Sequence, residues 1–183
     1  DQVRAGVAQI QARHGRVYGL VNNAGVNDGI DLAAGPEAFR ASLNVNLIHY
    51  YTMVHLLADD LRAEKGAVVN ISSKTAVTGQ GNTSAYVAAK AAQLGLTREW
   101  AAAFLKDGVR VNAILPGPFI TNIAGGRLRN KADRAAFESQ SLIGRIGDVE
   151  DIKGLALLLA SPAGSLFTGS LIVIDGGSLT RMT

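Results

Sequence analysis

Cysteine is absent from this 183-residue chain, which excludes disulfides, thiolate metal sites and thiol catalysis. Proline is also scarce, at 4 residues, so the 21 glycines are expected to punctuate secondary-structure elements and not to form a disordered tract. No apolar stretch reaches the ~18 residues of a membrane-spanning helix, and no signal peptide is visible at the start shown. We therefore expect a cytoplasmic protein without a membrane segment.

The chain also lacks a large excess of either charge: the net charge is +3 at pH 7, and acidic and basic residues are interspersed. Nucleic-acid grooves and membrane-binding surfaces usually gather basic residues on one face, so neither partner is expected. Hydrophobic residues make up 48% of the chain, enough for a packed core. We predict a single domain over residues 1–183.

Apolar runs alternate with segments of helical pattern. AVVNIS, VRVNAIL and SLIVID are continuous Val- and Ile-rich runs, typical of parallel strands covered on both faces. The alternation predicts an α/β fold with a doubly wound parallel sheet of the Rossmann type. Pro36 suits a helix start and Gly108 a helix stop. Strands are expected at 17–22, 67–72, 109–114 and 171–175, and helices at 2–14, 35–63, 83–105 and 148–160, with another within 121–140.

One predicted strand runs into a polar, glycine-containing loop, VYGLVNNAGVNDG, at residues 17–29. In a parallel α/β sheet, ligands bind at the carboxyl ends of strands. Small residues after such a strand let a ligand approach the backbone closely. The stretch therefore predicts one wall of a binding site.

Tyr86 and Lys90 are four residues apart in a predicted helix, so their Cβ atoms should lie about 5–6 Å apart on one face. A neighbouring cation favours the phenolate and lowers the pKa of a tyrosine from near ~10. Such a pair suits general acid–base catalysis. The alternative is a tyrosine packed on the sheet beside a lysine whose amine reaches water.

Two further polar features accompany this pair. Ser73 ends a predicted strand, where its hydroxyl is placed to bond a substrate carbonyl or alkoxide or, alternatively, to make a local turn bond. Asn44 and Asn46 interrupt an apolar helix, although Asn is a poor helix former. An inward-pointing Asn would bind a water molecule or stabilise a kink in the helix. In the alternative, one faces solvent and the other caps a local bend.

With NNAG at 22–25, these residues resemble the short-chain dehydrogenase/reductase family. The resemblance covers nearly the whole chain, since NVN at 44–46, YVAAK at 86–90, NAILPG at 112–117 and IDGG at 174–177 follow in the family's order. It implies an NAD(P)-dependent oxidoreductase that interconverts a secondary alcohol and a carbonyl, with either NAD or NADP as cofactor.

The resemblance also implies residue roles. Tyr86 would be the acid/base, Lys90 would lower its pKa and bind the nicotinamide ribose, and Ser73 would orient the substrate oxygen. Asn46 would hold a water of a proton relay. The implied cofactor contacts are Asn23, Ala24, Gly25, Tyr86, Lys90, Pro116, Gly117, Ile120 and Thr121. Residues 121–140 would form a substrate-side lid with a hinge at Gly125 and Gly126, or else a plain solvated loop.

The stretches around NNAG and between Ser73 and Tyr86 resemble those of sugar-oxidising members, especially fucose-type dehydrogenases. Gln80 and Asn82 would then bind sugar hydroxyls, or they are ordinary turn formers. A sugar or polyol is thus the favoured substrate. The family commonly forms homodimers or homotetramers through its long helices, and the segment around Trp100 is read as core or subunit interface. His14, His49 and His55 show no metal-ligand spacing, so no metal is expected.

The family's dinucleotide fingerprint, Thr-Gly-x-x-x-Gly-x-Gly after its first strand, is missing, as is the residue that selects NAD or NADP. By the resemblance, the domain lacks its first three strands, and strand 17–22 becomes a sheet edge. The pyrophosphate would lose its helix N-terminus and glycine loop. Either the working protein carries the missing half, or this is an N-terminally truncated, inactive fragment that acts, if at all, through oligomeric association.

Overall fold

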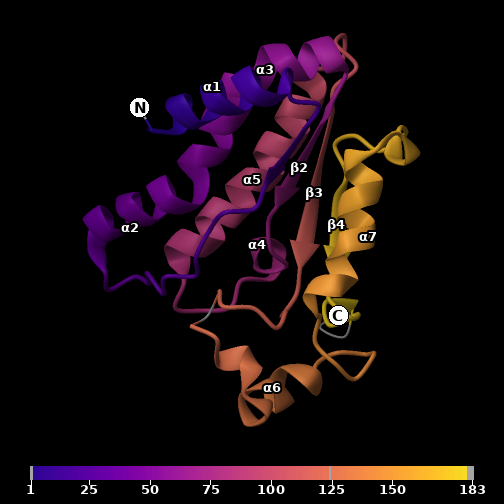
Figure 1. Cartoon of the computed structure of the whole chain (residues 1–183). Coiled ribbons are helices and arrows are strands. Elements are labelled where there is room, and N and C mark those ends of the chain that lie inside the picture. The colour runs from indigo at the N-terminus through magenta and orange to yellow at the C-terminus, as the bar shows by residue number, and fades with distance from the viewer. Residues whose placement is uncertain (1, 124, 181–183) are drawn as a thin grey trace.

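A computed structural model of the chain describes residues 2–123 and 125–180. Its centre is a parallel four-stranded sheet in the order β1-β2-β3-β4, with helices on both faces (Figure 1). The predicted α/β class and parallel sheet are therefore confirmed. The strands are β1 (Gly19–Asn22), β2 (Ala67–Ile71), β3 (Arg110–Pro116) and β4 (Leu171–Ile174).

The helices lie close to the predicted ranges, and among the described residues none is long and apolar enough to cross a membrane. They are α1 (Gln2–His14), α2 (Gly35–Leu43), α3 (His49–Glu64), α4 (Thr75–Thr78), α5 (Ser84–Ala103), α6 (Lys131–Glu138) and α7 (Val149–Ala160). Short irregular helices are η1 (Asn44–Ile48), η2 (Arg127–Arg129) and η3 (Pro162–Gly164).

The two central strands, β2 and β3, are largely apolar because both faces of the sheet are covered there. Val68 and Val111 are fully buried in a cluster with α1, α3 and α5. Val69 and Ile114, which point the other way along the same strands, pack in a cluster with α7. Successive side chains of a strand alternate between faces, so continuous hydrophobic runs follow from this double cover.

The predicted helix 35–63 is not continuous. Residues Asn44–Ile48 form a single π-helical turn between α2 and α3. Asn44 is exposed, whereas Asn46 is fully buried. An extra residue in the turn rotates the following helix, and such π-bulges are frequent at functional sites. The two asparagines thus mark a bend, as their poor helix propensity suggested.

A chain of buried amides ties the sheet to α5. The side-chain amide of Asn22 donates to Asn70 Oδ1 at 2.9 Å, and the amide of Asn70 donates to Thr97 Oγ1 at 3.0 Å. All three residues are at most 4% exposed. Since buried polar groups cost free energy unless they are bonded, these contacts fix how α5 lies against the carboxyl ends of β1 and β2.

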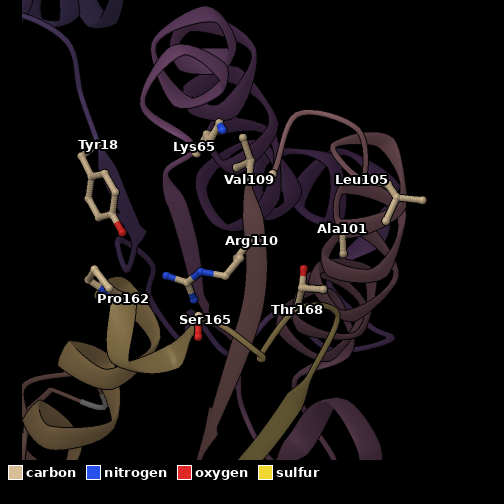
Figure 2. Close-up of a pocket in the computed structure, with 10 residues that line it drawn as sticks. Tyr18, Lys65, Ala101, Leu105, Val109, Arg110, Pro162, Ser165 and Thr168 are labelled. Carbon is tan, nitrogen blue, oxygen red and sulfur yellow. The ribbon is translucent and has the colours of Figure 1, made fainter.

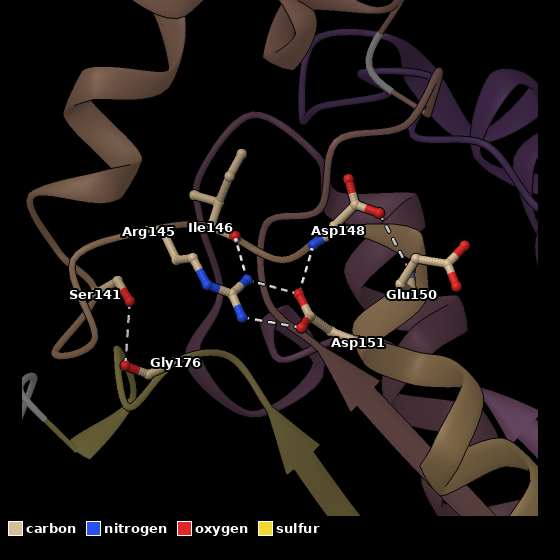
Figure 3. A network of polar contacts seen from close by, with 7 residues as sticks. All are labelled: Ser141, Arg145, Ile146, Asp148, Glu150, Asp151 and Gly176. Atoms are coloured by element: carbon tan, nitrogen blue, oxygen red, sulfur yellow. Dashed lines mark hydrogen bonds and ion pairs between the residues drawn. The ribbon is translucent and has the colours of Figure 1, made fainter.

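The segment after β3 is anchored at both of its ends. Phe119 and Gly147 form an isolated bridge, and the Ser141 hydroxyl donates to the Gly176 carbonyl at 3.2 Å (Figure 3). Arg145 forms a bidentate ion pair with Asp151 in the first turn of α7 and lowers the pKa of that carboxyl to about 2. The predicted lid therefore has fixed ends.

Arg110 holds the carboxyl end of α7, and its loss should be destabilising. Its guanidinium donates to the carbonyls of Leu159, Ser161 and Gly164 at 2.9–3.0 Å. Arg110→Met would leave these acceptors unpaired, which we expect to cost about 3 kcal/mol and to lower Tm by about 6–12 °C. Calorimetry checks this, with Arg98→Met on exposed α5 surface as the control. Equal Tm values for the two variants would contradict it.

Candidate active site

Polar side chains converge at the carboxyl ends of β2 and β3. Ser73 follows β2, and Tyr86 and Lys90 lie on the first turns of α5, with exposures of 8%, 5% and 3%. The Ser72 hydroxyl donates to the Lys90 backbone carbonyl at 2.8 Å and so holds α5 against the strand end. The structure thus brings together three of the four predicted catalytic residues, and Asn46 lies alongside, near the same glycine as Lys90.

Ser73 is oriented by its neighbour. The Thr75 hydroxyl and amide both donate to Ser73 Oγ, at 2.9 and 3.2 Å. Because its oxygen accepts these two bonds, the Ser73 proton is free to point at another oxygen. The hydrogen bond between Ser73 and Tyr86 lowers the pKa of the tyrosine, as a donor to the phenolate oxygen does.

The net shift of Tyr86 differs from the sequence-based expectation. Burial raises the pKa of Tyr86 above its usual value, and the bond with Ser73 offsets only part of that rise. Lys90 was expected to lower it, but its ammonium lies over the Tyr86 ring, 5.6 Å from the centroid, and donates to the Ile71 carbonyl at 2.8 Å. At neutral pH the tyrosine is therefore a protonated phenol, suited to giving a proton.

Lys90 is a charge held away from water. Burial lowers its pKa to about 8. Its ammonium lies between two aromatic rings, Tyr86 and Tyr50, each with its centroid at 5.6 Å. The sequence analysis missed Tyr50, which is fully buried and also donates to the Ile71 carbonyl at 2.8 Å. In the sequence, the one feature that could have pointed to Tyr50 is its position four residues after Asn46.

The loop after β1 meets this cluster from the side. Asn46 Oδ1 accepts the Val26 amide at 2.8 Å. A Cβ at Gly25 would lie 3.1 Å from Asn46 Oδ1 and 3.7 Å from Lys90 Nζ, so a glycine lets the loop approach both groups. His49 Nε2 lies 3.0 Å from the Ala24 carbonyl and steadies the same loop.

Most predicted cofactor contacts lie along this edge of the sheet. Asn23 and Ala24 are exposed just after β1. Gly117 follows β3, and a Cβ there would lie 2.6 Å from Asp175 Cβ, so the LPG and IDGG motifs touch only because this residue is glycine. The remaining predicted contacts are half-buried after the same strand or at its end: Pro116, Ile120 and Thr121.

Other predicted residues have structural surroundings. Gln80 is exposed and donates to Thr83 Oγ1 at 3.1 Å, and Asn82 is exposed with φ of 53° in the adjoining turn. Both thus form the turn that leads into α5, as expected if they are ordinary turn formers. Their predicted contact with sugar hydroxyls stays a prediction. Trp100 is 8% exposed in the core, which favours core over interface. Within the described residues no cluster of His and carboxylates suits a metal ion.

A cavity of about 500 Å³ lies at the other end of the sheet (Figure 2). Its lining includes Tyr18, Lys65 and Arg110, which come just before or at the start of β1, β2 and β3. It therefore opens at the amino ends of the strands, opposite the catalytic cluster. The Arg110 guanidinium in its wall already donates to three carbonyls near the end of α7. Because this cavity lies away from the catalytic cluster, it is not the candidate site.

The cluster fits the nicotinamide half of a dinucleotide. An ammonium has three protons to donate, and for Lys90 the structure gives one acceptor, the Ile71 carbonyl. A buried ammonium needs further acceptors, which ribose hydroxyls supply. Asn23 and Ala24 are exposed on the loop whose Gly25 lies close to Lys90 Nζ, so a ligand beside this loop would be near the ammonium.

Comparison with known proteins supports this interpretation. Residues 1–178 match the family model described as enoyl-(acyl carrier protein) reductase. The chain is 34% identical over 179 residues to 3-oxoacyl-(acyl-carrier-protein) reductase of Thermotoga maritima, covering 97% of this chain and 72% of that protein. It is 35% identical over 181 residues to 2-keto-3-deoxy-L-fuconate dehydrogenase of Xanthomonas campestris, covering 94% of this chain and 60% of that protein.

The fold is also shared with solved structures. A gluconate 5-dehydrogenase from Burkholderia cenocepacia, crystallised with NADP and tartrate, superposes with a TM-score of 0.90 at 30% identity. The match covers 98% of this chain and 71% of that one. Sequence and fold therefore agree, and the chain belongs to the short-chain dehydrogenase/reductase family of NAD(P)-dependent oxidoreductases.

Proposed function

We propose that this chain carries the catalytic half of an enzyme that interconverts a secondary alcohol and a carbonyl, with Tyr86 as the proton donor and acceptor. The observation that carries the proposal is the hydrogen bond between the buried Tyr86 hydroxyl and Ser73, beside the Lys90 ammonium. The nicotinamide cofactor supplies the hydride chemistry when bound. The protein positions the reacting oxygen and moves its proton.

Each residue has a separate task in this proposal. The Ser73 proton, left free by the two bonds from Thr75, orients the substrate oxygen. Tyr86 gives its proton to that oxygen during carbonyl reduction and takes it back during alcohol oxidation. Lys90 binds the ribose, and Asn46 holds the relay water that links Lys90 to solvent.

A sugar, sugar acid or polyol is the proposed substrate class. Two of the similar proteins act, by their names, on 2-keto-3-deoxy-L-fuconate and on gluconate. Gln80 and Asn82 are exposed in the turn just before Tyr86, and in this proposal their amides bind the substrate hydroxyls. The segment 121–140, with fixed ends and a left-handed Gly125–Gly126 pair, is proposed as the lid over that substrate.

Self-association through the long helices is part of the proposal. Apolar side chains remain exposed on the outer side of η1 and α3, namely Val45 at 52%, Ile48 at 49% and Tyr51 at 57%. A second copy packing on them would bury this surface, as homodimers and homotetramers do.

The test is a paired activity screen. The purified protein is incubated with NAD or NADP and a panel of aldoses, sugar acids and polyols, and with a 3-oxoacyl thioester in the reducing direction. We expect a change in absorbance at the reduced nicotinamide band with at least one sugar or sugar acid. Turnover of the thioester alone would overturn the substrate class. Absence of any turnover, with stable association in light scattering, would instead support an inactive fragment.

A further inference from the structure

A buried chain of contacts beside the catalytic cluster joins Asn46 to Lys90 through two residues without an assigned role. Gln93 on α5 and Tyr50 on α3 are both fully buried. Neither belongs to a motif that the sequence analysis singled out. Their contacts connect α5 with η1 and α3, which are far from it in sequence.

The first link runs from Gln93 to the π-helical turn. The Gln93 side-chain amide donates to the Asn46 backbone carbonyl at 2.8 Å. It also bonds the Tyr50 hydroxyl, which lowers the pKa of that tyrosine against the larger raising effect of burial. Gln93 therefore links the π-helical turn to Tyr50.

The orientation of Gln93 is forced by its neighbours. Turning the amide over would place its oxygen against the Asn46 carbonyl oxygen, and two acceptors repel each other. In the orientation present, Gln93 Oε1 is buried without a hydrogen-bond partner among the described residues. An unpaired buried acceptor costs free energy, which the bond from Gln93 Nε2 to the Asn46 carbonyl offsets.

The second link runs from Tyr50 to Lys90. The Tyr50 hydroxyl donates to the Ile71 carbonyl, and the Lys90 ammonium donates to the same oxygen, both at 2.8 Å. The ammonium also lies over the Tyr50 ring. Tyr50 therefore takes one lone pair of the Ile71 carbonyl that Lys90 also uses, and limits where the ammonium can lie.

We propose that Gln93 and Tyr50 are positioning residues, which fix the distance between the Asn46 carbonyl and the Lys90 ammonium and so set the geometry of the proton relay. This inference rests on the proposed function. The chain runs from the Asn46 carbonyl to the Gln93 amide, the Tyr50 hydroxyl, the Ile71 carbonyl and the Lys90 ammonium. It works as one unit, so removing either middle residue breaks the whole of it.

The kinetic test uses Tyr50→Phe, Gln93→Met and the double variant. Each single change should lower kcat by about tenfold to a hundredfold, because small displacements of catalytic groups cost this much. KM and cofactor Kd should stay within about twofold, and the solvent deuterium isotope effect on kcat should rise as proton transfer slows. The double variant should lose no more than the worse single variant, since residues in one network are not additive.

Tyr18→Phe is the matched control, because Tyr18 is 37% exposed and lines the cavity at the opposite end of the sheet. It should leave kcat and the isotope effect unchanged. Additive losses in the double variant, an unchanged isotope effect, or wild-type kcat in Tyr50→Phe would each overturn the proposal. If one single variant fails to fold, the other carries the comparison.

A second measurement does not need turnover. With 13Cε-labelled lysine, the Lys90 resonance, assigned by its absence from Lys90→Met, is titrated in wild type and Tyr50→Phe. Without the Tyr50 hydroxyl, both lone pairs of the Ile71 carbonyl face the ammonium, so the midpoint should rise from about 8. An unmoved midpoint overturns the proposal. Absence of turnover in wild type would count against the proposed function alone, because the titration still decides this inference.

Discussion

Tyr86→Phe is expected to lower kcat by about 10³-fold, the middle of the range for loss of a general acid–base. The substitution removes only the hydroxyl that bonds Ser73, and leaves the ring beneath the Lys90 ammonium in place. The fold should therefore persist, with a stability change of about 1 kcal/mol for the lost hydrogen bond. Steady-state kinetics with the best substrate of the screen measures kcat, and tryptophan fluorescence follows cofactor binding.

The cofactor Kd of Tyr86→Phe should remain nearly that of the wild type, since the hydroxyl acts on the substrate oxygen. Tyr18→Phe is the control, because Tyr18 lines the cavity at the opposite end of the sheet. Turnover in Tyr86→Phe within a few-fold of wild type would remove Tyr86 from its acid–base role and, with it, the proposed mechanism.

Lys90→Met should abolish most turnover and yet stabilise the protein at neutral pH. The buried ammonium has a pKa of about 8 in the folded chain, below its ordinary value of 10.5. Below about pH 8 both folded and unfolded chains carry this proton, and the penalty of burying it is present in full, at about 3 kcal/mol. Methionine removes that penalty but loses the bond to Ile71, so the net gain should be about 1–3 kcal/mol.

The dependence on pH is the sharper part of this prediction. Between about pH 8 and 10.5 the unfolded chain retains the Lys90 proton that the folded chain has lost. Stability rises with pH wherever the unfolded state binds more protons. The advantage of Lys90→Met over wild type should therefore shrink by about 3 kcal/mol across this interval. Urea titrations at pH 7, 8.5 and 10 measure it, and Lys106→Met at an exposed site is the control. A constant difference at all three values would contradict a buried ammonium.

Much of the site could be predicted from the sequence, because the relative positions of its residues follow from short separations along the chain. Tyr86 and Lys90 share a helix, and Ser73 directly follows a strand, so secondary structure alone places them at one edge of the sheet. The helix bend at Asn44 and Asn46 was also foreseeable, since Asn disfavours the helix interior. Its form, a π-helical turn with one asparagine buried and one exposed, was not.

The parts that were missed depend on contacts across long stretches of sequence. Gln93 meets Asn46 across 47 positions, and Lys74 donates to Ser178 at 2.6 Å across 104 positions. No local pattern predicts which of several polar residues on a helix will find such a partner. The net pKa of Tyr86 also differs from the expectation, because burial, which no local spacing predicts, raises it.

The sequence by itself determined the family, the parallel α/β fold and the identity of the reactive groups, because strand and helix periodicity and short motif spacings are local properties of the chain. Only the tertiary structure decided how those groups are set. It placed Lys90 on the Ile71 carbonyl between two tyrosine rings, brought Ser73 beside Tyr86, and joined Gln93 and Tyr50 to the cluster. Burial and hydrogen-bond partners set pKa values, and both arise only when distant segments pack together.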